Sequence, residues 1–110
     1  MLEIDVSQNG NAFTVGVGDV ILLNLIENPS TGYRWILSSE VKPVLELEKD
    51  DYSPSGAAPG AFGSRTLKFE TTQAGHVDLK LECRRSWEKR AAETFTVSIH
   101  AKATKRLAST

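Results

Sequence analysis

Apolar residues alternate with polar residues in several short stretches of this chain, and this alternation limits the fold more than any other feature. The clearest cases are residues 76–83, HVDLKLEC, and residues 94–101, TFTVSIHA. Residues 64–71, SRTLKFET, show the same pattern, and residues 44–50, VLELEKD, show it more weakly. A period of two residues is typical of β-strands with one buried and one solvated face. We therefore expect a fold made of half-buried strands.

Two further segments have less regular patterns. Residues 20–26, VILLNLI, are a nearly continuous apolar run bounded by turn residues, which predicts a buried strand. Residues 86–95, SWEKRAAETF, are the best candidate for a helix, but alternating strands lie on both sides of them. We therefore expect a loop there, with at most one helical turn.

Turn residues separate the expected strands at short intervals. They recur at residues 8–10, 16–18, 28–32, 42–43, 53–63 and 73–75. About seven short strands separated by such turns predict an all-β sandwich. The length of 110 residues fits a single domain, and we expect it to occupy residues 1–103, with a polar tail at 104–110.

The direction of the strands predicts where the loops lie. If each strand reverses the direction of the one before it, three connections fall at one end of the sandwich. These connections are residues 28–33, 53–63 and 84–92, which are also the least strand-like segments of the central and C-terminal chain. Because a rigid scaffold that gathers loops is a common basis for binding, this end is the candidate binding surface.

The composition and the reactive residues disfavour several function classes. Thirteen Lys and Arg against fourteen Asp and Glu give a formal net charge of -1, so no strong field draws the chain to nucleic acid or an anionic membrane. The one cysteine, Cys83, excludes an internal disulfide, and no Cys/His spacing indicates a metal site. Cys83 has the phase of a packed thiol, and neither His76 nor His100 has the setting of a base or ligand. We expect no enzyme activity and no cofactor.

The N-terminal sequence bears on the compartment. MLEIDVSQNG has no basic segment followed by an apolar one, and no run in the chain approaches the length of a membrane span. We expect a cytoplasmic or intracellular protein for the chain as given, or a secreted or periplasmic one if a leader has been removed.

The segment NPSTGY, which begins at Asn28, has the chemistry of a stiff turn. Pro29 fixes its own backbone angle and restricts Asn28, while Gly32 tolerates conformations that few residues adopt. Ser30 and Thr31 would occupy the tip, where small side chains let a partner approach the backbone. On this motif alone, an ordinary β-turn is the simpler interpretation.

Aromatic and basic residues of the other loops also admit two interpretations. Trp87 lies among charged residues, and is either a recognition anchor or a cover over the end of the sandwich. Arg85 is either a partner for carboxylates of a bound protein or an ordinary solvated strand end. Trp35 shares its phase with Leu37, and we expect it in the core.

Together, the three loops resemble those of the chagasin-like inhibitors of cysteine peptidases. That family is marked by an N-P-T-T-G-Y-type loop, a glycine-rich G-x-G-G-type loop and an R-P-W-type loop, in this order. Here they appear as NPSTGY at 28–33, GAFG at 60–63 and RSW at 85–87. Phe62 stands in place of a glycine of the second loop, and Ser86 in place of the proline of the third.

The resemblance covers roughly residues 3–103 and carries expectations about fold and function. It implies an immunoglobulin-like antiparallel β-sandwich of about seven to eight strands. It also implies a reversible, tight-binding inhibitor of papain-like cysteine peptidases, monomeric when free, which occludes the active-site cleft with its three loops. The peptidase-binding residues that it implies are Asn28, Pro29, Ser30, Thr31, Gly32, Tyr33, Gly60, Ala61, Phe62, Gly63, Arg85 and Trp87.

By the same resemblance, the three loops have different places in the cleft. Ser30 and Thr31 would lie near the catalytic cysteine of the peptidase and block it. Residues 60–63 would border one side of the cleft, and Arg85 and Trp87 would pack on the other. The alternative is an immunoglobulin-like adhesion or binding module that uses the same loops for a non-peptidase partner, because this fold hosts many functions.

Overall fold

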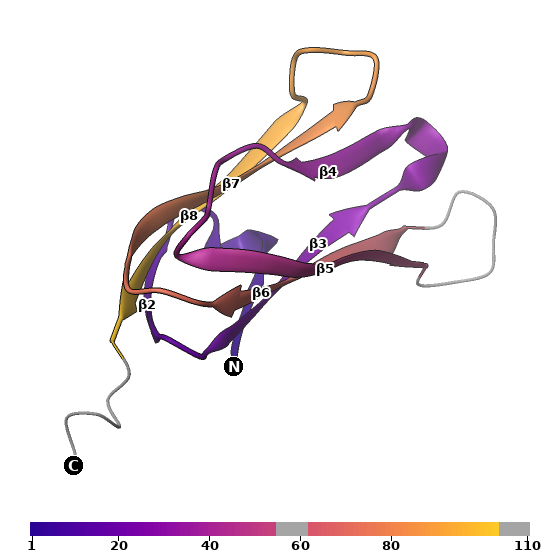
Figure 1. Cartoon of the computed structure of the whole chain (residues 1–110). Helices are drawn as coiled ribbons and strands as arrows, with labels where there is room; N and C mark the ends of the chain where they lie inside the picture. The colour runs from indigo at the N-terminus through magenta and orange to yellow at the C-terminus, as the bar shows by residue number, and fades with distance from the viewer. Residues whose placement is uncertain (55–61, 104–110) are drawn as a thin grey trace.

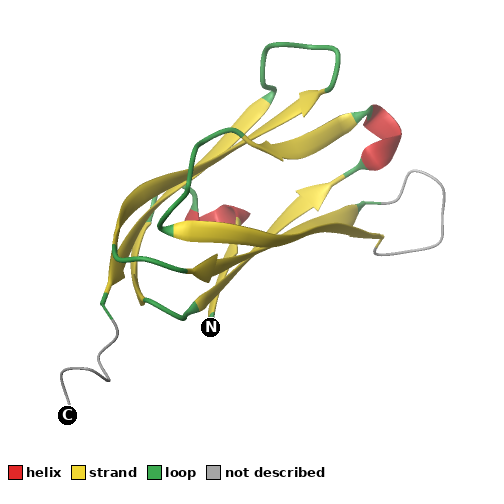
Figure 2. Ribbon diagram, viewed as in Figure 1, coloured by secondary structure: helices red, strands yellow, loops and turns green. Residues whose placement is uncertain are grey.

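The strands form two four-stranded sheets packed face to face (Figure 1). The computed structural model describes residues 1–54 and 62–103. One sheet has the order β1-β3-β6-β5 and consists of Leu2–Asp5, Val20–Glu27, Gly63–Thr71 and Leu45–Pro54. The other has the order β2-β8-β7-β4 and consists of Ala12–Gly16, Glu93–Lys102, Gly75–Arg85 and Tyr33–Leu37. Figure 2 shows the two short 3-10 turns, η1 at Val6–Gln8 and η2 at Pro29–Thr31, in red.

The core lies between the two sheets and is built from the inward phase of the alternating strands. In β6, the burial pattern alternates along the whole strand, with Leu67 and Phe69 fully buried. In β8, Phe95, Val97 and Ile99 are buried, while the residues between them are not. The alternation in the sequence therefore corresponds to one face packed on the opposite sheet and one face toward solvent.

The predicted all-β sandwich of seven to eight strands is confirmed, but the expectation of wholly antiparallel pairing is wrong for two strands. β1 pairs with β3 in parallel, and β2 pairs with β8 in parallel. Successive strands do reverse direction, as expected. However, β1 and β2 belong to different sheets, so each lies beside a strand that runs the same way. The η1 turn, capped by the Asp5 carboxylate, carries the chain from one sheet to the other.

The strand at 20–26 also differs from its expected form. β3 is half-buried: Ile21, Leu23 and Leu25 are buried, whereas Ile26 is 63% exposed. Its outer face lies on the surface of a two-layer sandwich, and no helix of residues 1–54 and 62–103 covers it. The apolar run in the sequence therefore does not mark a strand buried on both faces.

The strands next to the three candidate loops are longer than expected. β5 continues to Pro54, and β7 continues to Arg85. The segment from 86 to 92 is a loop, as predicted, with no helix. The proposed tail at 104–110 lies outside the described residues. No helix in the described part of the chain is long and apolar enough to cross a membrane.

The phase of β3 is tested by the same substitution at two neighbouring positions. Leu23→Ala should lower the free energy of unfolding by about 2–5 kcal/mol, because it leaves a cavity in the core. Leu22→Ala, on the outer face of the same strand, should cost clearly less. Urea denaturation of both variants measures the difference, and equal losses would show that the assigned phase is wrong.

Candidate functional site

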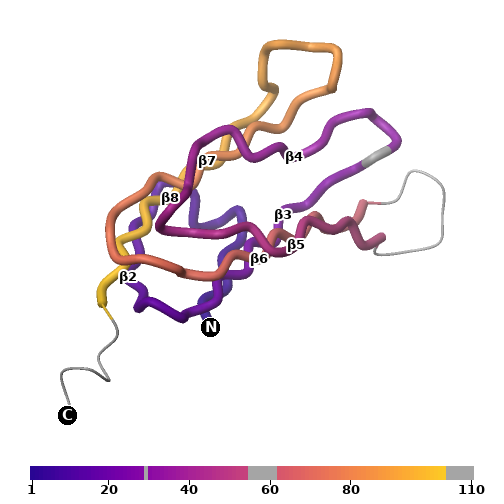
Figure 3. Tube along the Cα trace, in the orientation of Figure 1, coloured from indigo at the N-terminus to yellow at the C-terminus, as the bar shows by residue number. Residues whose placement is uncertain are grey.

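Two of the three candidate loops, loops 1 and 3, lie at one end of the sandwich, where β5 ends and β6 begins. Loop 1, residues 28–32, connects β3 to β4, and loop 3, residues 86–92, connects β7 to β8. Figures 1 and 3 show these two loops next to each other at the same end. The second connection starts and finishes at this end too, since Pro54 and Gly63 are paired at the ends of β5 and β6. Gly60 and Ala61 lie outside the described residues.

Loop 1 is held in shape by its own side chains. The Asn28 Oδ1 atom accepts hydrogen bonds from the Ser30 amide at 3.1 Å and from the Ser30 hydroxyl at 2.7 Å. The Thr31 hydroxyl donates to the Asn28 carbonyl at 2.8 Å. Ser30 and Thr31 are both exposed at the tip, as expected. Because their hydroxyls already have partners within the loop, the tip can offer a partner its shape and backbone without any rearrangement.

Loop 3 is joined to loop 1 by Arg85. Its Nε donates to the Thr31 carbonyl at 3.0 Å. Its guanidinium lies over the Tyr33 ring, 4.5 Å from the centroid, and 5.8 Å from the centroid of the Trp87 ring. Tyr33 is therefore half-buried beneath Arg85, and the contacts connect both loops through charge, hydrogen bonding and cation–π attraction.

Gly32 and Trp87 bring the two loops close together. Gly32 has a φ of +82°, a conformation that favours glycine. A Cβ atom placed on it would lie 3.0 Å from Cη2 of Trp87. Trp87 nevertheless remains 72% exposed, so most of its ring is available to a partner. Loop 3 itself is braced by bonds from the Glu88 amide to the Arg85 carbonyl and from Arg84 to the Glu88 carbonyl.

Phe62 and Gly63, at the start of β6, have different settings. Phe62 is 60% exposed. Gly63 is buried, and a Cβ atom there would overlap the Tyr52 hydroxyl and the Ser53 carbonyl. Gly63 therefore permits close packing of β5 and β6, while Phe62 presents its side chain at the surface.

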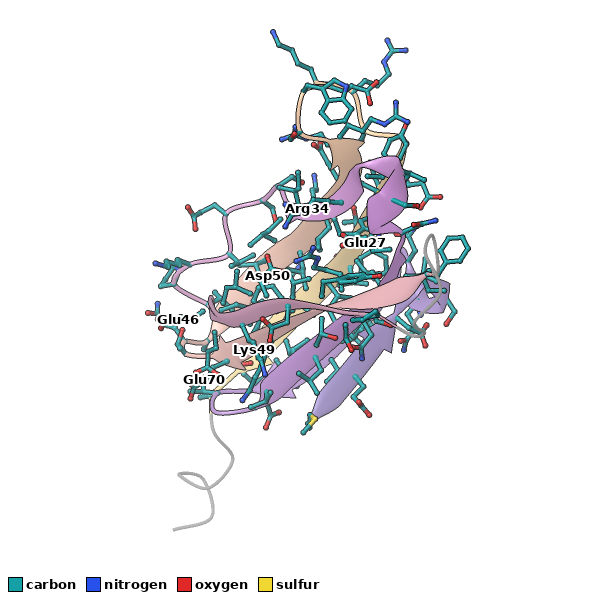
Figure 4. The ribbon with its side chains drawn as sticks, turned by 90° about the vertical axis from the view of Figure 1, so that its right-hand side faces the viewer. Glu27, Arg34, Glu46, Lys49, Asp50 and Glu70 are labelled. Carbon is teal, nitrogen blue, oxygen red and sulfur yellow. The ribbon has the colours of Figure 1, made fainter. Side chains whose placement is uncertain are left out.

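A buried ion pair lies directly beneath the loops. Glu27, the last residue of β3, is 3% exposed, and Arg65 of β6 is 7% exposed. The Arg65 Nη2 atom is 2.8 Å from Glu27 Oε2, and its Nε donates to the same carboxylate. Arg65 also contacts Asp50 at 3.1 Å. Figure 4 views the loop end of the molecule and labels both carboxylates. The bonds to Glu27 raise the pKa of Arg65, so it stays charged despite its burial.

The ion pair also fixes the strand that leaves loop 1. The Glu27 Oε1 atom accepts from the Trp35 amide at 2.7 Å, and the Trp35 indole donates to the Ile26 carbonyl at 2.9 Å. Trp35 is buried, as expected. This network was not predicted from the sequence. The available signal was one charged residue at an inward-facing position in each of two strands. Glu27 lies two residues after Leu25, and Arg65 lies two residues before Leu67.

Cys83 lies near the loop end of β7, whereas His76 lies near the opposite end of that strand, paired with His100. Cys83 is half-buried, and its burial raises the pKa of the thiol, with further contributions from the Glu93 and Glu27 carboxylates. His76 and His100 lie on the exposed face of the sheet. Over residues 1–54 and 62–103, no group of three or more His, Cys, Asp or Glu residues could hold a metal ion.

Comparisons with known proteins identify relatives of this chain. The model of the family described as "Chagasin family peptidase inhibitor I42" matches residues 14–99. Chagasin of Trypanosoma cruzi is 26% identical over 106 residues, covering 90% of this chain and 96% of the relative. Amoebiasin-1 of Entamoeba histolytica is 28% identical over 102 residues, covering 90% and 98%.

Two solved structures share the fold. The crystal structure of the cysteine protease inhibitor EhICP2 from Entamoeba histolytica has a TM-score of 0.84 and 22% identity, covering 92% of this chain and 95% of that one. The structure of PbICP-C in complex with falcipain-2 has a TM-score of 0.61 and 13% identity, covering 94% and 100%. At these identities, both matches support the immunoglobulin-like sandwich itself.

Breaking the buried ion pair should destabilise the domain strongly. Arg65→Met leaves the Glu27 carboxylate buried without a counter-charge, so the free energy of unfolding should fall by about 3–5 kcal/mol. The double variant Glu27→Gln with Arg65→Met should recover part of the loss, because neither site then carries a charge.

Urea denaturation measures these differences, and an exposed ion pair provides the control. Asp51→Asn removes the contact between Lys49 and Asp51, whose side chains are 62% and 58% exposed, and should leave the midpoint nearly unchanged. An Arg65→Met variant as stable as the wild type would contradict the role assigned to the pair.

Proposed function

The chain belongs to the chagasin family of peptidase inhibitors, and we propose that its loop end enters and blocks the active-site cleft of a papain-like cysteine peptidase. The family match confirms the resemblance inferred from the three loop motifs. Because the family consists of inhibitors, the chain is not an enzyme. EhICP2 is described as a cysteine protease inhibitor, and we extend that class of target to this chain.

The observation that carries the mechanism is the contact between loop 1 and loop 3. Arg85 bonds the Thr31 carbonyl, and Trp87 packs beside Gly32, so the two loops form one surface in the free protein. Loops already held in their bound shape lose little conformational entropy when they dock. The structure of the free chain therefore favours tight binding.

Loop 1 provides the central part of the proposed interface. Its exposed tip, Ser30 and Thr31, would occupy the cleft near the catalytic cysteine. The tip is a 3-10 turn held by the side chain of Asn28 and the hydroxyl of Thr31. To be cleaved as an extended substrate it would first have to lose these bonds, which favours occlusion without hydrolysis.

Loop 3 and Phe62 would contact the two sides of the cleft. Trp87 offers a large exposed aromatic surface, the type of side chain that dominates interface energies. Ser86, which replaces the proline of the family motif, lies in a loop that two hydrogen bonds already brace: the Glu88 amide donates to the Arg85 carbonyl, and the Glu88 carbonyl accepts from Arg84. Inhibition should therefore survive this replacement.

The alternative function is an adhesion module with a non-peptidase partner. The inhibition assay separates the two functions.

Two loop substitutions test the inhibitory surface. Thr31→Glu adds a charge and bulk at the tip, and Trp87→Ala removes the exposed aromatic ring. Each should raise the inhibition constant against active-site-titrated papain by tenfold or more, with little change in melting temperature. Gln73→Glu, an exposed position at the opposite end of the sandwich, should leave inhibition unchanged. Full papain activity at micromolar wild-type protein would rule out the proposed function.

A pair of glycine substitutions separates loop contact from backbone strain. Gly32→Ala should weaken inhibition, because its Cβ would press on Trp87 and displace loop 3. Gly18→Ala imposes comparable strain, since Gly18 has a φ of +98°, but a Cβ there meets no atom within 4 Å. Both variants should lose stability, and only the first should lose inhibition. Equal inhibition by both would show that the contact between Gly32 and Trp87 is irrelevant to binding.

A further inference from the structure

Large apolar side chains at the surface gather on one flank of the loop end. Within the described residues, three of the exposed ones, Val6, Ile26 and Phe62, line a single groove of about 550 Å³. They are 48%, 63% and 60% exposed. We call this feature the flank groove. Its three side chains come from η1, from β3 and from the residue before β6, so the fold brings them together from distant parts of the sequence.

The flank groove continues directly into loop 1. Asn28 and Thr31, which shape the tip of the loop, also line the groove, and Trp35 and Cys83 line it from the core side. Asn28 is fixed by its bonds to Ser30, as described above. A protein that surrounds the tip of loop 1 would therefore also contact this groove.

The chemistry of the groove selects an apolar occupant. Among its lining residues, Glu93 is the one charged side chain, and no Lys or Arg is present. A second hollow at the loop end is different, because its charged lining residues are Arg34, Arg65, Arg84 and Asp50. The loop end therefore has one apolar hollow and one charged, mainly basic hollow.

The size of the groove indicates that it does not bind a partner alone. Three partly exposed side chains offer on the order of a few hundred Å², whereas a stable protein interface buries roughly 800 Å² on each partner. Together with loops 1 and 3, the same side chains would enlarge the proposed interface with the peptidase, whose central part is loop 1. A second copy of this chain would have to cover the loops as well.

We propose that the flank groove is a fourth contact region for the target peptidase and receives an apolar side chain from the wall of its active-site cleft. The inference rests on the proposed function and adds Val6 and Ile26 to the surface that binds the peptidase. These residues lie outside the three loop motifs. They select among peptidases according to whether the facing wall is apolar.

Threonine substitutions test this region with little change in shape. At Ile26 of β3, Thr retains a high β-propensity, and at Val6 of η1, Thr has nearly the size and shape of Val. Ile26→Thr should raise the inhibition constant against active-site-titrated papain about tenfold, and Val6→Thr should raise it several-fold. The loss should appear mainly as faster dissociation. Leu47→Thr is the matched control, because Leu47 is an exposed apolar residue of β5 that does not line the groove, and its inhibition constant should stay within about twofold of the wild type.

The outcomes distinguish this proposal from the proposed function. If Ile26→Thr and Val6→Thr inhibit papain like the wild type while Thr31→Glu does not, the fourth contact region is overturned and the inhibitory loops remain. If the wild type fails to inhibit, both proposals fall. If sedimentation shows a wild-type dimer that Ile26→Thr dissociates, the groove is a self-association surface and the proposal is again overturned.

Discussion

The buried contact between Glu27 and Arg65 is the interaction on which the geometry of the loop end depends. The Glu27 carboxylate lies on β3, accepts from Arg65 of β6 and accepts from the Trp35 amide of β4. Of these strands, β3 enters loop 1, β4 leaves it, and β6 follows the second connection. Burying two charges carries a desolvation cost that Coulomb attraction offsets only with good geometry. The pair is therefore better understood as fixing where the loops begin and end.

Above this pair, the loops are joined to one another by short-range contacts. Arg85 contacts the Thr31 carbonyl and the Tyr33 ring, and Trp87 lies against Gly32. The small Gly32 of NPSTGY thus leaves room for the large ring of Trp87. The proposed inhibition depends on shape, burial and prior order, and it requires no proton transfer and no covalent bond.

The sequence predicted what depends on chain order and missed what depends on side-chain partners. The reversal of direction from each strand to the next predicted that the three loops lie at one end. This prediction requires only the number and order of the strands. The reversal of direction did not predict the parallel pairing of β1 with β3 and of β2 with β8, since neighbours in a sheet are not set by direction alone. Glu27 and Arg65 were not recognised, because a single charge on a strand usually belongs to a solvated face. The contact of Arg85 with Tyr33 requires knowledge of which strands pair.

Hydrogen exchange of the backbone amides, with and without saturating papain, tests the central claim most directly. The account predicts added protection in loop 1 and loop 3, at residues 28–33 and 86–92. The turns at the opposite end, residues 16–19 and 72–75, should exchange at unchanged rates. Protection confined to the opposite end, or no change in the two loops when papain is bound, would contradict the assignment of the loop end as the inhibitory surface.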